Sequence, residues 1–257
     1  MIESLAHYKL LGRMGSDGIG EVFRARDSRL GRTVAIKLVT DAIATDSDRR
    51  ERFLRDARAS AALSHPNIAA LFEIGEDQGR LFLAIEFVPG ETLSATIGGR
   101  PMNPRRALDV ALNLADALAE AHAAGLVHRA LDPRHVIVTP KGTAKILDFG
   151  LSQWTRGEVN TRYTSPEQTL GGDVDYRTDI FSMGVIVIEM LTGAPPAQRG
   201  IASTVNSRLP REVDAIVTKA VAGDRESRYQ SAAVLAADLR SIVASLEQQR
   251  IAAERSR

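Results

Sequence analysis

The chain has 257 residues, of which 44% are hydrophobic and 25% charged, the composition of an ordinary soluble globular protein. A formal net charge of +1 excludes a whole-molecule field that would draw it to nucleic acid or to a membrane surface. Because cysteine is absent, disulfides, cysteine nucleophiles and thiolate metal sites are also excluded.

No membrane segment is expected in this chain. The opening residues, MIESLAHYKL, lack the basic start and apolar run of a secretory signal. The longest apolar stretch, residues 180–191, contains Glu189 and is shorter than the roughly 20 residues that a membrane-spanning helix needs. We therefore interpret this stretch as a buried helix and expect a cytoplasmic protein.

The first third of the chain predicts a small, mostly antiparallel sheet with one helix. Alternating or β-branched runs, bounded by Gly, Asp and Ser, predict strands over residues 8–15, 20–27, 33–40, 68–75 and 80–88. Between the third and fourth strands, Phe53, Ala57 and Ala61 recur at helical spacing. This pattern predicts a helix from Asp46 to Leu63, with Ser47 or Asp48 as the N-cap.

The remainder of the chain predicts mainly helices. Apolar residues at three- and four-residue spacing predict an amphipathic helix over 104–124. Two short strands are expected near 135–139 and 144–148, followed by helices over about 176–192, 211–222 and 231 to the end. The fold class is therefore α+β, with a sheet-rich lobe of about 1–88 and a helical lobe of about 89–257 that meet near residues 86–91.

The last predicted helix has heptad-like spacing at Leu235, Leu239, Ile242 and Leu246. A coiled coil is one interpretation of this pattern. An ordinary helix packed on the helical lobe is favoured, because fewer than about three heptads are present.

Six short motifs occur in a fixed order along the chain. They are VAIK at 34–37, HPNI at 65–68, HRALDPRH at 128–135, DFG at 148–150, SPE at 165–167 and DIFSMGV at 179–185. This ordered set resembles a bacterial Hanks-type (eukaryotic-like) Ser/Thr protein kinase domain over nearly the whole chain. The resemblance implies a two-lobed kinase fold with ATP bound between the lobes.

The resemblance implies that a glycine loop and a lysine hold the nucleotide phosphates. The loop runs from Gly15 to Gly20, and Asp17 stands where the family has its second glycine. Either Asp17 crowds and repels the phosphates, or it points to solvent while a neighbouring glycine supplies the flexibility. Lys37 matches the phosphate-holding lysine, and Asp56 stands where the family has the glutamate that pairs with it.

The adenine slot implied by the resemblance looks usable. The residues that would form it, together with Glu86 between the lobes, are Val22, Ala35, Ile85, Val88, Ile137 and Leu147.

The catalytic loop keeps its frame but changes its reactive groups. Ala130 replaces the carboxylate that accepts the substrate proton, and general-base groups of that kind are worth about 10²- to 10⁴-fold. Asp132 replaces the lysine that contacts the transferred phosphate. His135 replaces a metal-binding asparagine, so Asp148 remains as the metal ligand. Magnesium prefers oxygen ligands, and binding of Mg²⁺ or Mn²⁺ is therefore doubtful.

Two segments that the resemblance connects with substrate docking are short. The activation segment, residues 151–164, has only fourteen residues, and residues 197–210 predict a loop where related domains carry an extra helix. Positions with a structural role are kept, because Glu167 and Arg228 match a buried ion pair and Asp179 matches a carboxylate that caps the catalytic loop.

These observations lead to three hypotheses. The first is a pseudokinase, a kinase-fold regulatory or scaffolding module that binds ATP or ADP weakly. Its partner would be a protein, such as another kinase or signalling protein, or a second copy in a homodimer. The second is an active Ser/Thr kinase, or another phosphoryl or nucleotidyl transferase, of atypical mechanism that uses Lys37 and Asp148. The third is a switch that closes on nucleotide without reacting.

Overall fold

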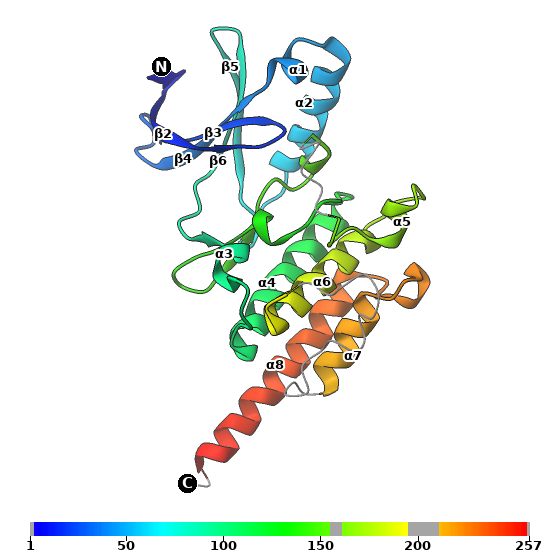
Figure 1. The fold of residues 1–257 in the computed structure, drawn as a ribbon. Helices are drawn as coiled ribbons and strands as arrows, with labels where there is room; N and C mark the ends of the chain where they lie inside the picture. The colour runs from blue at the N-terminus through cyan, green and yellow to red at the C-terminus, as the bar shows by residue number, and fades with distance from the viewer. Residues whose placement is uncertain (1–2, 155–160, 195–210, 256–257) are drawn as a thin grey trace.

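The computed structural model describes residues 3–154, 161–194 and 211–255 of the chain. They form a sheet-rich lobe above a helical lobe (Figure 1), which confirms the α+β class. The predicted loop at 197–210 lies outside the described residues, as do residues 155–160 of the short activation segment.

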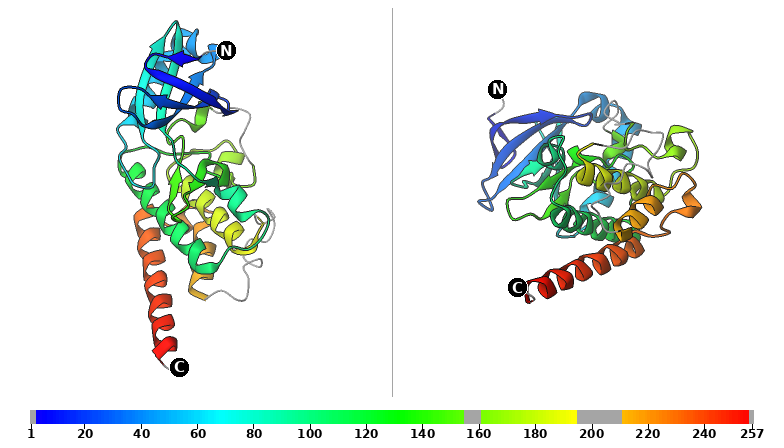
Figure 2. Two further views of the ribbon diagram at one scale, coloured as in Figure 1. Left: turned by 90° about the vertical axis from the view of Figure 1, so that its left-hand side faces the viewer. Right: turned by 60° about the horizontal axis from the view of Figure 1, so that its bottom comes forward.

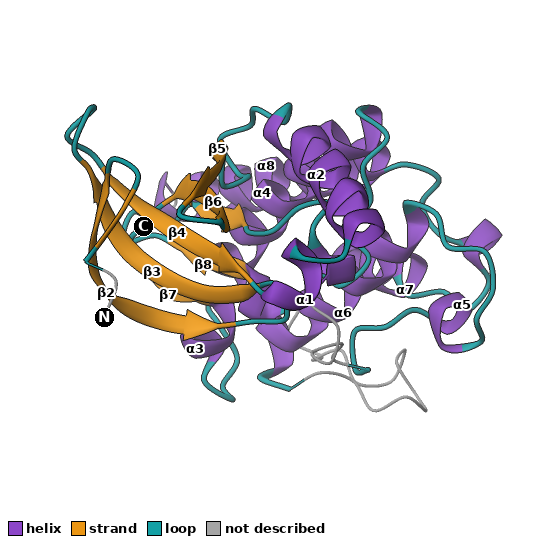
Figure 3. Ribbon diagram, turned by 90° about the horizontal axis from the view of Figure 1, so that it is seen from above, coloured by secondary structure: helices purple, strands orange, loops and turns teal. Residues whose placement is uncertain are grey.

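The upper lobe is built on an antiparallel sheet of six strands in the order β1-β2-β3-β4-β6-β5. Figure 3 shows its strands curving side by side, with the first two helices beside them. The strands are β1 (Ser4–Leu5), β2 (Tyr8–Ser16), β3 (Gly20–Asp27), β4 (Thr33–Val39), β5 (Leu71–Asp77) and β6 (Arg80–Glu86).

Strand β5 begins three residues later than predicted. Ile68 forms an isolated parallel bridge with Ile146 of the lower lobe, and the Ala69 N–H donates to the Ile146 carbonyl at 2.9 Å. The apolar run that predicted one strand therefore serves two sheets, and its first residues join the lobes.

Two helices pack beside this sheet, α1 (Asp41–Ala44) and α2 (Ser47–Ala61). The predicted N-cap of α2 is wrong by one residue: Asp46 occupies it, and its carboxylate accepts from the Arg49 N–H at 3.0 Å. Phe53 and Ala57 are buried as the helical spacing predicted, whereas Ala61, in the last turn, is exposed.

The lower lobe contains a three-stranded sheet and six described α-helices. The sheet has the order β7-β8-β9, with β7 at Glu91–Thr92, β8 at Val136–Val138 and β9 at Ala144–Ile146. The helices are α3 (Leu93–Ile97), α4 (Pro104–Ala123), α5 (Pro166–Thr169), α6 (Arg177–Thr192), α7 (Arg211–Ala220) and α8 (Ala232–Arg255). Helices α3 and α5 were not predicted, because segments of four or five residues are too short to show helical periodicity.

Helix α6 is buried over nearly all its length and forms the centre of the lower core, with α4 and α7 against it. Helix α8 packs along α4, and its last turns extend beyond the body of the lobe (Figure 2). The heptad-like residues Leu235, Leu239 and Ile242 are buried within the lower core. The ordinary packed helix is therefore the correct interpretation of this pattern.

Within the described ranges, we find no helix whose length and apolarity would let it cross a membrane.

Candidate functional site

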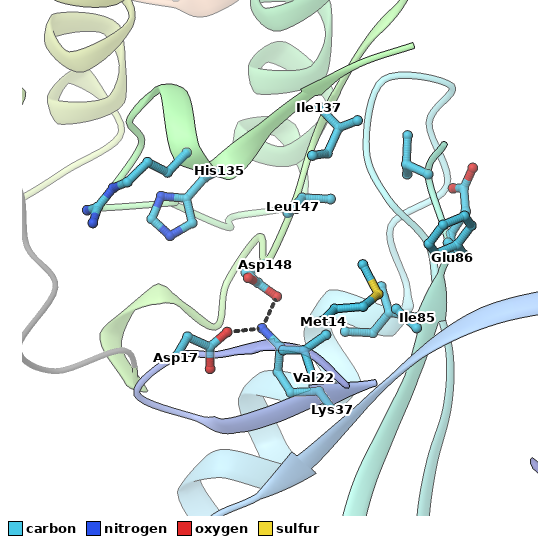
Figure 4. Close-up of a pocket in the computed structure, with 14 residues that line it drawn as sticks. Met14, Asp17, Val22, Lys37, Ile85, Glu86, His135, Ile137, Leu147 and Asp148 are labelled. Carbon is cyan, nitrogen blue, oxygen red and sulfur yellow. Dashed lines mark hydrogen bonds and ion pairs between the residues drawn. The ribbon is translucent and has the colours of Figure 1, made fainter. Parts of the chain in front are cut away.

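A cavity of about 240 Å³ lies between the two lobes (Figure 4). It is smaller than most ligand pockets, which span ~300–1,000 Å³. Its lining comes from both lobes and from the strand that joins them: Met14, Asp17, Val22, Ala35, Lys37, Ile85, Glu86, Phe87, Val88, Arg134, His135, Ile137, Leu147 and Asp148.

Every residue predicted for the adenine slot lines this cavity. Val22 and Ala35 project from the neighbouring strands β3 and β4, which pair in register, and Ile137 and Leu147 come from the small sheet below and the residue that follows it. This part of the cavity is apolar on both faces. A flat heteroaromatic ring is the ligand shape that two opposed apolar faces suit best.

Lys37 lies at the polar end of the cavity, between two carboxylates (Figure 4). Its Nζ is 2.7 Å from Asp148 Oδ1 and 2.5 Å from Asp17 Oδ2, and only 4% of its side chain is exposed. Burial alone would lower the pKa of Lys37, but the two carboxylates outweigh burial and raise it. The ammonium is therefore fully charged at neutral pH.

Asp148 has an uncommon backbone conformation, with a φ of 55°. Arg129 of the catalytic loop shares this left-handed conformation, with a φ of 69°. Such residues cost about 1–3 kcal/mol each and cluster at functional sites. Burial alone would raise the pKa of Asp148, but the Lys37 ammonium outweighs it and lowers the pKa below its usual range.

Asp56, which stands where the resemblance places the partner of Lys37, does not contact that lysine. Asp56 instead accepts a hydrogen bond from Trp154 Nε1 at 2.8 Å, and the Trp154 ring packs edge-on against Phe53 at 5.5 Å. Both contacts join helix α2 to the short 3-10 helix at Ser152–Trp154, which follows Asp148. Asp56 therefore fixes helix α2 to this segment and does not line the cavity.

The two outer glycines of the loop, Gly15 and Gly20, do not line the cavity either. Gly20 is required by packing, because a Cβ at this position would lie 1.5 Å from the Leu38 carbonyl oxygen on the adjacent strand. At Gly15 an added Cβ would meet nothing within 4 Å. Gly15 is therefore not fixed by steric contacts.

The catalytic-loop residue Asp132, which replaces the phosphate-contacting lysine implied by the resemblance, does not face the cavity between the lobes. Its side chain is 3% exposed and does not line the cavity, because it is bound to its own neighbours. Arg134 Nη2 lies 2.7 Å from Asp132 Oδ2, and His135 Nδ1 lies 3.3 Å from Asp132 Oδ1. Burial alone would raise the pKa of Asp132, but these contacts lower it well below the usual range.

Arg134 and His135 line the cavity, while Ala130 lines two separate hollows near Arg129 and Thr164. The methyl group of Ala130 offers neither a proton acceptor nor a hydrogen bond. Arg134 was not predicted from the sequence, although a basic residue within the altered catalytic loop could have indicated it. Met14, Phe87 and Trp154, which carry no motif, were not predicted either.

Asp179 holds the backbone of the catalytic loop as predicted. Its carboxylate accepts from the N–H groups of His128 and Arg129, both at 2.8 Å, and lies 2.9 Å from His122 Nε2. Burial, helped by the nearby His135, lowers the pKa of His128 to about 4. His128 is therefore neutral at physiological pH and serves the frame of the loop.

The predicted ion pair of Glu167 and Arg228 is also confirmed. Arg228 Nη1 and Nη2 each lie 2.7 Å from one oxygen of the Glu167 carboxylate, and the Arg228 side chain is fully buried. The pair ties helix α5 to the lower core. The structural positions of the motifs are thus intact around an altered catalytic loop.

Asp148 and His135 occupy the two positions where the resemblance implies metal ligands. Among the described residues, no group of three or more His, Asp or Glu side chains is placed to hold a metal ion. Asp148 offers a carboxylate, but its Oδ1 already accepts from Lys37, and His135 supplies an imidazole where a second oxygen ligand would serve Mg²⁺ better. We therefore derive no step that passes through a metal.

Comparison with known families gives one match that covers most of the chain. The family described as "Protein kinase domain" matches residues 8–255. A crystal structure of a double mutant of the PknI kinase domain from Mycobacterium tuberculosis superposes with a TM-score of 0.78 and 27% sequence identity, over 94% of this chain and 98% of that one.

Curated relatives are similar over 90–91% of this chain. A probable serine/threonine-protein kinase of Streptomyces coelicolor and the serine/threonine-protein kinase PknB of Mycobacterium tuberculosis are each 34% identical to it, and PrkC of Bacillus subtilis is 32% identical. The alignments cover 39%, 42% and 40% of these relatives, so the chain spans about two fifths of their length.

Proposed function

The chain belongs to the protein kinase domain family, and from that premise we propose that it is a kinase-fold regulatory or scaffolding module. In this proposal an adenine-type ligand binds between the lobes, and phosphoryl transfer is slow or absent. The observation that carries the proposal is Ala130, which places a methyl group where the resemblance implies a proton-accepting carboxylate.

Asp132, the carboxylate two residues further along the loop, is poorly placed to replace the missing base. Asp132 is buried, and both of its oxygens accept hydrogen bonds from Arg134, Oδ1 from the backbone N–H and Oδ2 from the guanidinium group, each at 2.7 Å. Using it as a base would require breaking contacts that hold its pKa low. Loss of a general base costs about 10²- to 10⁴-fold in rate, which supports a module that binds more than it catalyses.

A radiolabel transfer assay tests the proposal directly. The wild type is incubated with labelled ATP, Mg²⁺ or Mn²⁺, and a serine- and threonine-rich acceptor protein, beside Lys37→Ala and Asp148→Ala. We expect no incorporation above that of the two variants. Incorporation that disappears in both variants would contradict the proposal, whereas incorporation that survives both would come from a contaminant.

A second candidate function is phosphoryl transfer to serine or threonine by an atypical mechanism. The comparisons favour this candidate over the first, because the curated relatives are described as serine/threonine-protein kinases. In the site, it is supported by the Lys37–Asp148 contact at 2.7 Å and by Arg134, a cation of the altered loop that lines the cavity. Transfer that depends on both Lys37 and Asp148 is its signature in the same assay.

Ligand binding is tested by thermal melting with adenosine, ADP and ATP, each with Mg²⁺, Mn²⁺ or EDTA. A ligand present at about 100 times its dissociation constant stabilises the folded state by roughly 2.7 kcal/mol. Stabilisation by ATP without turnover would support a switch that closes on nucleotide. If no ligand shifts the melting temperature, the cavity binds none of these ligands, and the protein would act as a scaffold that does not depend on a ligand.

We also propose that the module works in the cytoplasm through a protein partner or a second copy of itself. Light scattering after size-exclusion chromatography distinguishes these two alternatives. A homodimer would have twice the mass of one chain, whereas the mass of a single chain would favour a different protein as the partner.

A further inference from the structure

Asp17 closes the glycine loop with its own carboxylate. Its Oδ1 accepts hydrogen bonds from the N–H groups of Ile19 at 2.9 Å and Gly20 at 3.1 Å. The Asp17 N–H donates to the Gly20 carbonyl at 2.9 Å, which completes the turn between strands β2 and β3. Two backbone donors of the loop are therefore already bound to an anion from the same chain.

The second oxygen of the same carboxylate binds the buried cation of the cavity. Asp17 Oδ2 lies 2.5 Å from Lys37 Nζ, and 17% of the Asp17 side chain is exposed (Figure 4). Successive backbone N–H groups with a nearby ammonium are the donor set that proteins use for phosphate and other anions. Asp17 thus fills an anion site with its own side chain.

The charge at this end of the cavity is unfavourable for a further anion. One ammonium, Lys37, faces two carboxylates, Asp17 and Asp148, so these three groups carry a net charge of −1. A phosphate tail would have to displace Asp17 from three polar contacts and then lie close to both carboxylates. The apolar end of the cavity, around Val22 and Leu147, is unaffected by this arrangement.

We propose that Asp17 is a built-in anion in the phosphate subsite, and that it selects uncharged nucleosides over ligands with a phosphate tail. Asp17 is in this view the specificity-determining residue of the cavity. The inference rests on the proposed function, because it takes the cavity to accept an adenine-type ligand, and it adds the class of that ligand.

The test compares the affinities of adenosine, ADP and ATP by isothermal titration calorimetry, in EDTA so that bound metal does not mask ligand charge. Three proteins are compared first: wild type, Asp17→Asn and Asp17→Gly. Asn keeps an oxygen for the loop amides but removes the charge, whereas Gly removes both. Circular dichroism confirms folding, and Asp17→Asn decides the outcome if Asp17→Gly does not fold.

Asp27 provides a matched control at the other end of strand β3. Its Oδ1 accepts from the N–H groups of Arg29 and Leu30, both at 3.0 Å, and its Oδ2 lies 3.3 Å from Arg32 Nε. The local contacts therefore repeat those of Asp17, but Asp27 does not line the cavity. Asp27→Asn therefore tests whether removing the charge of any turn-capping carboxylate changes the preference between ligands.

We expect wild type to bind adenosine more tightly than ATP, and both Asp17 variants to shift the ATP-to-adenosine affinity ratio toward ATP by ~10-fold or more. Asp27→Asn should leave the ratio unchanged. An unchanged ATP-to-adenosine affinity ratio in the Asp17 variants, or an equal shift in Asp27→Asn, overturns the inference about Asp17. If adenosine still binds in that case, the proposed adenine-type ligand stands. If no protein binds any of the three ligands, the proposed ligand itself is wrong and the inference falls with it.

Discussion

Replacing Arg228 by methionine should destabilise the fold by about 3–5 kcal/mol, the usual cost of removing one partner of a buried ion pair. The Arg228 side chain is fully buried, and it contacts both oxygens of Glu167 at 2.7 Å. Methionine restores part of the volume but none of the charge. The Glu167 carboxylate, whose side chain is 13% exposed, would then be left without its cation.

The pKa of Glu167 gives an order of magnitude for the contacts that hold this carboxylate. Burial alone would raise the pKa, but hydrogen bonds from Arg228, with further ones from the Glu167 N–H and the Thr178 hydroxyl, outweigh it and lower the pKa from 4.5 to about 2. At about 1.4 kcal/mol for each pKa unit, this difference corresponds to ~3 kcal/mol for all of these contacts together. Because the folded pKa is below the unfolded one, the stabilisation is present above about pH 4.5 and is lost as the pH falls toward 2.

Urea unfolding followed by circular dichroism measures this effect in wild type, Arg228→Met, Glu167→Gln and the double variant. At about pH 7 the wild type should exceed Arg228→Met by ~3 kcal/mol, and the gap should narrow as the pH falls toward 3. The double variant should lose less than Arg228→Met, because it leaves no buried charge unpaired. A gap below ~1 kcal/mol, or one independent of pH, would refute the reasoning.

Four further substitutions have definite expected outcomes. Lys37→Met should lower the melting temperature by an amount equivalent to ~3–5 kcal/mol, since it leaves two carboxylates without their cation; a melting temperature equal to wild type would contradict this. Gly20→Ala should cost more than ~2 kcal/mol in urea, because its Cβ would collide with the Leu38 carbonyl oxygen, whereas Gly15→Ala should stay within ~0.5 kcal/mol; equal costs would remove the steric explanation. Trp154→Phe keeps an aromatic ring but deletes the N–H donor, so it should lower the free energy of unfolding in urea by ~1 kcal/mol. An unchanged free energy of unfolding would argue against the hydrogen bond to Asp56.

The sequence was sufficient for the features that depend on local pattern. Helix α4 follows the spacing of its apolar residues, and its N-cap Asn103 accepts from the N–H groups of Arg105 and Arg106. The apolar slot followed from ordered motifs, whose positions on strands fix which way Val22 and Ala35 face. Such features need no knowledge of distant side chains.

Side-chain pairing in the site was not predictable in the same way. Asp17 and Asp56 are both aspartates within reach of the cavity by sequence position, yet Asp17 binds Lys37 and Asp56 binds Trp154. Which carboxylate meets the lysine depends on how the segment after Asp148 packs on helix α2. That packing is tertiary, and no periodicity in the chain reports it.

The position of Trp154 makes its intrinsic fluorescence a probe of how helix α2 contacts the segment after Asp148. Trp154 is the chain's single tryptophan, and it contacts helix α2 through Phe53 and Asp56 from the segment that follows Asp148. Its fluorescence therefore has one source, whose wavelength and intensity depend on the ring contact and the N–H bond together. Any ligand that moves helix α2 against that segment should change the emission without an attached dye, so lobe movement can be timed in stopped flow on the unmodified chain.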